Sequence, residues 1–250
     1  AQHVELKEHW EYDTIQRSEV KRHLNEYFYY GGLPEIQSFK NKRAMLSSLY
    51  QKIYLGDICA RNNIKNDRVL NILIKKMAES VKQPLSYNRL KNVIVATRSP
   101  ISVPTTIDYV DYASDSWLIL PMENEVGKLT EKEMQKKYYF VDNGLLNLFL
   151  MNSETSLLEN MVAVELCRRF GKKNVFFLNA EKEIDFIVLD EKLAIQVSYS
   201  IKDETTYNRE VPPLVKYAKA HKDWKCLLIT YDEEGTEEGI TVVPVWKWLM

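Results

Sequence analysis

The stretch that most constrains the fold runs from residue 157 to residue 198, where one helical pattern precedes three short strand patterns. The helix covers 157–166, and β-type runs cover 174–179, 183–189 and 193–199. Asp185 lies between Ile184 and Phe186, so strand alternation predicts that its side chain points away from both and shares a face with Glu183. A carboxylate within an apolar strand needs a partner.

This layout resembles the PD-(D/E)xK metal-dependent nucleases, which carry a helix carboxylate, a strand carboxylate and an acid-x-lysine signature on a third strand. The resemblance implies that Glu159 is the helix carboxylate and Asp185 the strand carboxylate, and that both would be the ligands of a metal. At the third motif the chain reads Gln196-Val197-Ser198. The resemblance therefore implies one cluster of Glu159, Asp185 and Gln196 with a degenerate third motif.

The altered third motif predicts a nuclease-like fold with low activity. Mg²⁺ prefers hard oxygen ligands, including carboxylates, whereas Gln196 brings no charge and Ser198 cannot replace a lysine that activates water. We expect Gln196 to donate its amide to Asp185, and Lys182 is a candidate for the missing lysine. The alternative is an active nuclease with a variant third motif, in which Glu159 and Asp185 bind Mg²⁺; no other cofactor is expected.

Three further motifs extend the resemblance over most of the chain. The sequences YYGGLPE at 29–35, YLGDI at 54–58 and YYFVDNGL at 138–145 resemble the C-terminal half of bacterial and archaeal AAA-type ATPases. That resemblance implies a helical lid-like region at 1–64, a winged helix at 65–142 and a PD-(D/E)xK-like domain at 143–250. No G-x-x-x-x-G-K-[ST] loop occurs in the 250 residues. We expect a fragment whose parent protein binds ATP through an upstream ATPase domain.

The residues from 66 to 142 predict three helices and a two-stranded wing. Asp67 would cap a helix at 68–81, Ser86 would cap a second, and a third would start near Ser102. In such a domain the third helix enters the major groove of DNA. The predicted nucleic-acid-binding residues are Thr105, Thr106 and Tyr109 in the groove and Arg89, Lys91 and Arg98 on phosphates. Acidic residues at 108, 111 and 115 on the same helix favour a protein partner instead.

Composition limits the class of protein but does not choose between DNA and a protein as the partner. A hydrophobic fraction of 45% and a charged fraction of 28% are typical of a soluble globular protein. The net charge of -1 excludes binding of polyanions by bulk charge, so any DNA contact needs a local basic patch. Three separated cysteines indicate reduced thiols of a prokaryotic cytoplasm, and no apolar run is long enough to span a membrane. Strands that alternate with helices predict an α/β arrangement that ends in a mixed sheet with helices on its faces. Together with the N-terminal helices and the winged helix, this predicts an α+β fold for the chain overall.

Overall fold

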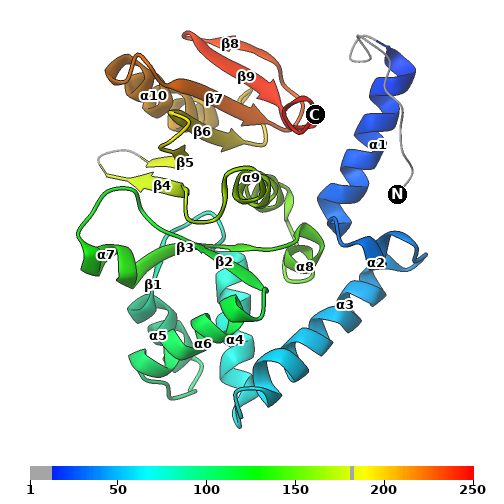
Figure 1. The fold of residues 1–250 in the computed structure, drawn as a ribbon, viewed down its shortest axis with the longest axis vertical. Coiled ribbons are helices and arrows are strands. Elements are labelled where there is room, and N and C mark those ends of the chain that lie inside the picture. The colour runs from blue at the N-terminus through cyan, green and yellow to red at the C-terminus, as the bar shows by residue number, and fades with distance from the viewer. Residues whose placement is uncertain (1–12, 181–182) are drawn as a thin grey trace.

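The computed structural model describes residues 13–180 and 183–250, and over these residues the chain has the expected α+β fold (Figure 1). One sheet has three strands in the order β1-β3-β2, and the other has six in the order β4-β5-β6-β7-β9-β8. Lys182 lies outside the described residues. None of the helices in the described part of the chain is both long and apolar enough to cross a membrane.

The N-terminal region is helical, as its sequence predicts. It contains α1 (Thr14–Tyr30), α2 (Pro34–Gln37), α3 (Lys42–Lys52) and the π-helical segment η2 (Ile53–Ala60) that continues α3. The Asp13 carboxylate caps α1 by accepting from the N–H groups of Ile15 and Gln16. Gly31 ends α1 with φ of 76°, a left-handed position that suits glycine, and Pro34 occupies the first position of α2, which suits proline.

The next unit, called the three-helix unit below, combines three longer helices and one short helix with the small antiparallel sheet. Its elements are α4 (Asp67–Glu79), β1 (Leu85–Ser86), α5 (Tyr87–Ala96), α6 (Val103–Asp115), β2 (Ile119–Met122), α7 (Leu129–Met134) and β3 (Gln135–Phe140). Ser86 caps α5 and Ser102 caps α6, as expected. The predicted cap at Asp67 is wrong, since Asp67 is the first residue of α4, and the expected loop before β3 contains α7.

The C-terminal unit is built on the six-stranded mixed sheet. Its elements are α8 (Asn143–Asn147), α9 (Glu154–Phe170), β4 (Val175–Asn179), β5 (Glu183–Val188), β6 (Leu193–Ser198), α10 (Glu204–Ala220), β7 (Lys225–Thr230), β8 (Gly235–Glu237), β9 (Ile240–Pro244) and α11 (Val245–Trp248). Strands β4, β5 and β6 pair antiparallel, and β6, β7 and β9 pair parallel. The acidic segment at 232–239 includes the edge strand β8.

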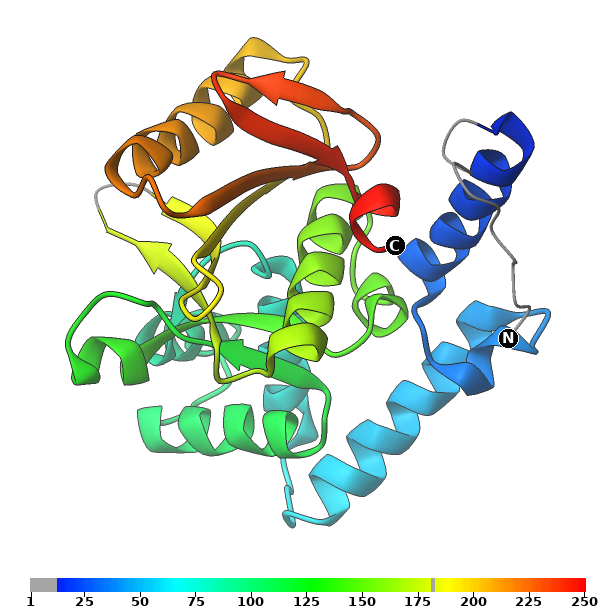
Figure 2. The same ribbon diagram turned by 45° about the horizontal axis from the view of Figure 1, so that its top comes forward.

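The core has two layers around this sheet, with α9 on one face and α10 on the other (Figure 2). Phe186, Ile195 and Val197 pack toward α9 in a cluster that continues through the three-helix unit to α1. Ala194 and Leu228 pack toward α10 in a second cluster. Because the larger cluster is continuous, the sheet and the three-helix unit are held against one another by apolar burial.

Two of the three motifs, those at 29–35 and 138–145, form one joint between α1 and α8. The Asp142 carboxylate accepts hydrogen bonds from the backbone N–H groups of Gly32 and Gly144, at 2.8 Å each. The amide of Asn143 donates to the carbonyl of Phe28 at 3.1 Å. Gly144 lies so close to Tyr30 that a Cβ atom there would be 2.3 Å from the Tyr30 carbonyl oxygen. These motif residues therefore have a structural role.

We predict that Gly144→Ala destabilises the protein by about 1–3 kcal/mol, the usual cost of overpacking a tight contact. The Cβ atom would meet backbone, which cannot rotate away as a side chain can. Gly56→Ala is the control, because a Cβ atom at Gly56 meets nothing within 4 Å. Urea denaturation measures both variants, and an equal effect of the two substitutions would contradict the close packing of α1 against α8.

Candidate functional site

A β-bulge in β5 sets the position of Asp185. Phe176 of β4 pairs with Ile187, and Leu178 pairs with Ile184. Between these two pairs β5 therefore contains one residue more than β4. As a consequence Ile184 packs in the cluster under α10, whereas Phe186 packs in the cluster under α9. The prediction that Ile184 and Phe186 share a face is therefore wrong, whereas Glu183 and Asp185 both reach the ammonium of Lys137. Bulges of this kind re-aim side chains, and here Asp185 lies within the bulged segment.

Side chains join β5 to β6 next to the bulge. The two strands pair directly as far as Phe186 and Ile195. One residue further, the backbone N–H of Asp185 donates to Gln196 Oε1 at 3.2 Å, and the N–H of Val197 donates to Asp185 Oδ2 at 2.9 Å. Gln196 Nε2 donates to Glu210 Oε2 of α10 at 2.5 Å. The expected donation from Gln196 to the Asp185 carboxylate is wrong, because the amide binds Glu210 instead.

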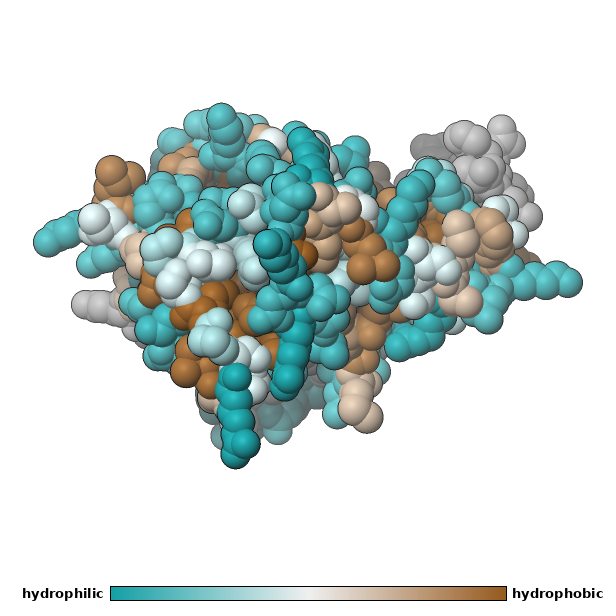
Figure 3. Space-filling view, turned by 90° about the horizontal axis from the view of Figure 1, so that it is seen from below, coloured by the Kyte–Doolittle hydropathy of each residue, from teal (hydrophilic) through white to brown (hydrophobic). Residues whose placement is uncertain are grey.

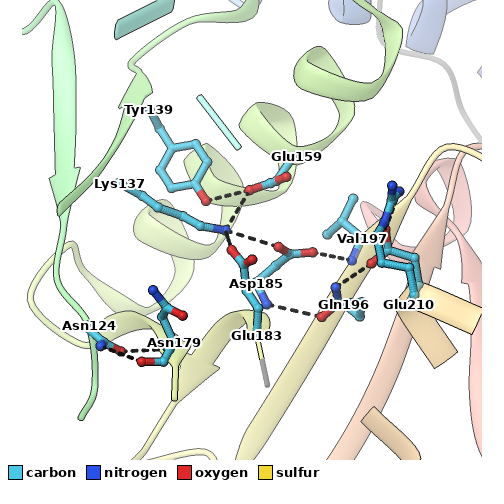
Figure 4. A network of polar contacts seen from close by, with 11 residues as sticks. Asn124, Lys137, Tyr139, Glu159, Asn179, Glu183, Asp185, Gln196, Val197 and Glu210 are labelled. Carbon is cyan, nitrogen blue, oxygen red and sulfur yellow. Dashed lines mark hydrogen bonds and ion pairs between the residues drawn. The ribbon is translucent and has the colours of Figure 1, made fainter. Parts of the chain in front are cut away.

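A lysine from the three-helix unit completes this cluster (Figure 4). Lys137 of β3 is fully buried, and its Nζ lies 3.2 Å from Glu159 Oε1, 3.2 Å from Asp185 Oδ1 and 3.0 Å from Glu183 Oε1. The structure thus brings Glu159, Asp185 and Gln196 together, as the resemblance implies. The ammonium group lies among three carboxylates, in the kind of position that a metal ion takes in a carboxylate site.

The surroundings of Glu159 and Lys137 shift the pKa values of these two groups. Burial raises the pKa of Glu159 to about 7, and Asp185 raises it as well, whereas Lys137 and a hydrogen bond from Tyr139 act in the opposite direction. The Tyr139 hydroxyl donates to Glu159 Oε1 at 2.8 Å. Burial alone would lower the pKa of Lys137, but Glu159 and the neighbouring acidic groups hold it well above its ordinary value. Lys137 is therefore a permanent cation at neutral pH.

The residues of the cluster do not fit a Mg²⁺ ion. Both oxygens of Asp185 and Oε1 of Glu159 already accept hydrogen bonds, and the Lys137 ammonium lies where they converge. Mg²⁺ requires free oxygen ligands in near-octahedral geometry. Within residues 13–180 and 183–250, no group of three His, Cys, Asp or Glu side chains is arranged to hold a metal ion. The cluster borders a cavity of about 380 Å³ that is also lined by Thr155, Ser198 and Arg209.

Asn160 fixes β3 against α9 beside Lys137. Its Oδ1 accepts from the Phe140 N–H at 2.7 Å, and its Nδ2 donates to the Phe140 carbonyl at 3.0 Å. Sequence reasoning missed Lys137, Tyr139 and Asn160 as parts of this site. The sequence contains one indication of their role. Lys137 and Tyr139 are two residues apart in a strand of apolar and aromatic residues, so their polar groups must lie on the same face of that strand.

The predicted DNA contacts lie on a different surface, on α5 and α6. Arg89 and Arg98 are exposed and Lys91 is half-buried. The predicted contact at Thr106 is wrong, because Thr106 is fully buried and its hydroxyl donates to the Ser102 carbonyl. The two other predicted groove residues are half-buried and line a hollow together with residues of the α5–α6 loop: Thr105, Tyr109, Pro100 and Ile101.

The exposed residues of α6 include Asp108 and Asp111. Basic exposed groups lie instead on α5 and just after it, at Arg89 and Arg98. The end of the molecule that carries these helices is mostly hydrophilic, and its hydrophobic residues gather in a few small areas (Figure 3). Any contact with a polyanion on this face would therefore start from α5 rather than from α6.

The raised pKa of Glu159 predicts a pH-dependent stability. Between about pH 4.5 and about pH 7 the folded protein holds a proton on Glu159 that the unfolded chain has lost. The free energy of unfolding therefore falls through this range as the pH rises. Glu159→Gln removes the titrating group, so its loss of stability between pH 5 and pH 7 should be smaller than that of the wild type. Urea denaturation at both pH values measures the free energy of unfolding of the two proteins. An equal loss in the variant and the wild type would contradict the raised pKa of Glu159.

Comparison with known proteins gives a family. The chain matches the family described as "Domain of unknown function (DUF8612)" over residues 21–156. It is similar to "Uncharacterized protein MJ1544" of Methanocaldococcus jannaschii, with 31% identity over 95% of this chain and 57% of that protein. It is also similar to an "Uncharacterized protein" of Haemophilus influenzae, with 30% identity over 92% of this chain and 58% of that protein.

The chain thus spans a little over half the length of these two relatives. No solved structure matches the chain significantly. The family match begins within α1, includes the three-helix unit with the strand that carries Lys137, and ends at the beginning of α9. Since this match covers more than half of the sequence, the chain belongs to the DUF8612 family.

Proposed function

We propose that this chain is a recognition region without nuclease activity, belonging to a prokaryotic cytoplasmic ATPase of the AAA type. The three motifs at 29–35, 54–58 and 138–145 support the ATPase part of this proposal. In it, ATP is bound by a domain upstream in the parent protein. The nuclease-like unit keeps its carboxylates as a joint between the two sheets, because those carboxylates bind a lysine of the neighbouring unit.

The single observation that carries the proposal is the buried ammonium of Lys137 within 3.2 Å of Glu159, Asp185 and Glu183. Metal-assisted hydrolysis needs a cation that can take open coordination positions and activate water. An ammonium group neutralises the carboxylates but has no such positions. Removing Lys137 to admit a metal ion would leave β3 without its contacts to Asp185 and Glu183.

DNA is the ligand that we propose for the recognition surface, with Arg89 and Arg98 as its phosphate contacts. Both guanidinium groups are exposed, whereas α6, the helix expected in the groove, presents aspartates to solvent. Phosphate contacts position a protein on DNA without reading its sequence. The contact proposed here is therefore weak in sequence preference and made mainly from α5 and the turn after it.

We predict that the chain binds a short DNA duplex with an affinity that falls steeply as salt rises. In the variant Arg89→Ala/Arg98→Ala the slope of log affinity against log salt should be shallower by about 2, one for each lost phosphate contact. Lys202→Ala/Lys222→Ala is the control, because these exposed lysines lie in the C-terminal unit. Fluorescence anisotropy over a salt series measures all three proteins. Absence of binding at low salt would refute DNA as the ligand and favour a protein partner.

We also predict that the chain binds neither Mg²⁺ nor Mn²⁺ at the cluster and cuts neither DNA nor RNA. Isothermal titration calorimetry checks the binding, and incubation with labelled single-stranded and duplex substrates checks cleavage. The physical reason is that the Lys137 ammonium already compensates the charge of Glu159 and Asp185. Divalent-dependent cleavage that is lost in Asp185→Ala would show an active nuclease and overturn this part of the proposal.

A further inference from the structure

Trp117 combines a backbone conformation and an exposure that are costly for a tryptophan. At the end of α6 the N–H of Leu118 donates to the Ala113 carbonyl, and the N–H of Trp117 donates to the Ser114 carbonyl, both at 3.0 Å. These two hydrogen bonds form a Schellman motif, in which the residue at the position of Trp117 is left-handed and usually glycine. Trp117 takes this conformation with φ of 54°. A bulky residue at positive φ is strained.

Packing does not compensate for this strain. The Trp117 side chain is 70% exposed, whereas Leu118, the next residue, is fully buried and provides the apolar contact that normally accompanies the motif. Among the tryptophans at described positions, Trp246 is buried and Trp224 and Trp248 are half-buried. Local folding thus prefers a glycine at position 117, and burial of apolar surface gives no reason for an indole ring there.

Two lysines lie on the turn that faces this ring. The Nζ atom of Lys172 is 5.7 Å from the centre of the Trp117 ring system, and Lys173 follows it. Both lysines are exposed, in the turn after α9 that begins at Gly171. The structure therefore places a largely exposed ring beside the ammonium of Lys172, with a second exposed lysine next in sequence. Asp115, on the last turn of α6, is exposed. Its negative charge would repel a polyanion, which would therefore bind on the side of the ring where the lysines lie.

We propose that Trp117 is a stacking platform for an unpaired base of single-stranded nucleic acid, and that Lys172 and Lys173 bind the flanking phosphates. Every base has a flat π-face that stacks on an exposed aromatic ring, and lysines attract the backbone that carries it. A cationic ligand for the ring would be repelled by both lysines. This site goes beyond the proposed duplex contact, because it uses neither Arg89 nor Arg98 and would remain if that contact failed.

The test uses Trp117→Gly, a substitution that the left-handed position favours. We expect the melting temperature of this variant to stay within about 3 °C of the wild type or to rise, as for an exposed site. Its affinity for a labelled ten-nucleotide oligothymidine should fall at least fivefold, roughly the contribution of one stacked base. Trp117→Phe should keep most of the affinity. Leu129→Ala is the control, since Leu129 is 75% exposed on α7.

A second variant tests the lysines. Lys172→Ala/Lys173→Ala should weaken binding of the same oligonucleotide and make its salt dependence shallower by about 1.5, as loss of two contacts to a single strand predicts. Anisotropy measures affinity, and quenching of tryptophan fluorescence reports stacking. Equal affinity of the wild type and Trp117→Gly, or no binding by the wild type, would overturn the proposal. Binding to anionic phospholipid vesicles but not to the oligonucleotide would overturn it in favour of a lipid surface.

Discussion

The ion cluster around Lys137 is the interaction on which the two sheets of this protein depend. A charged group taken out of water costs several kcal/mol unless it is paired and hydrogen-bonded. Lys137 is fully buried, and Glu159 and Asp185 are almost so. Because none of these groups could remain buried and ionised alone, β3, α9 and β5 must fold against one another. Breaking such a cluster by removing one partner typically costs 3–5 kcal/mol, whereas the intact cluster adds less net stability than its geometry suggests.

This cluster gives a physical reason for Gln196. A glutamate at this position would lack the N–H that Gln196 donates to Glu210, and it would bring a further negative charge beside Asp185. Burial and Asp185 already raise the pKa of Glu210, so its surroundings already disfavour more negative charge. A neutral side chain that accepts from the Asp185 N–H and donates to Glu210 satisfies both neighbours. The neutral side chain of Gln196 and the buried cation of Lys137 are thus two parts of one charge balance.

The sequence predicts the elements of this fold better than it predicts the contacts among them. The predicted strands at 174–179, 183–189 and 193–199 agree with β4, β5 and β6 to within about one residue, because alternation and turn residues are local signals. The glycines after α1 and the caps of α5 and α6 are equally local. Lys137 could not be assigned to the site in this way, since 48 residues separate it from Asp185 and it belongs to another unit.

Two other predictions are wrong for different reasons. Alternation fails at Asp185 because a bulge shifts the register, and bulges have no reliable signature in a single sequence. Thr106 was expected to face DNA from its place in a helix-turn-helix pattern, but its hydroxyl returns to the Ser102 carbonyl and its side chain is buried. Threonine in the first turn of a helix can bond to the backbone as easily as to a ligand.

The motifs that carry the resemblance therefore report on structure more than on chemistry. Asp142 and Gly144 hold α8 against the end of α1, and Lys137, next to the motif at 138–145, holds the two sheets together. Residues with such roles are fixed by packing, whatever the protein binds. The residues that local folding does not require are the exposed ones, and Trp117 is the clearest case, since glycine would suit its backbone better. The ligand of this protein is for that reason better sought at Trp117, Lys172 and the exposed arginines of α5 than at the carboxylate cluster.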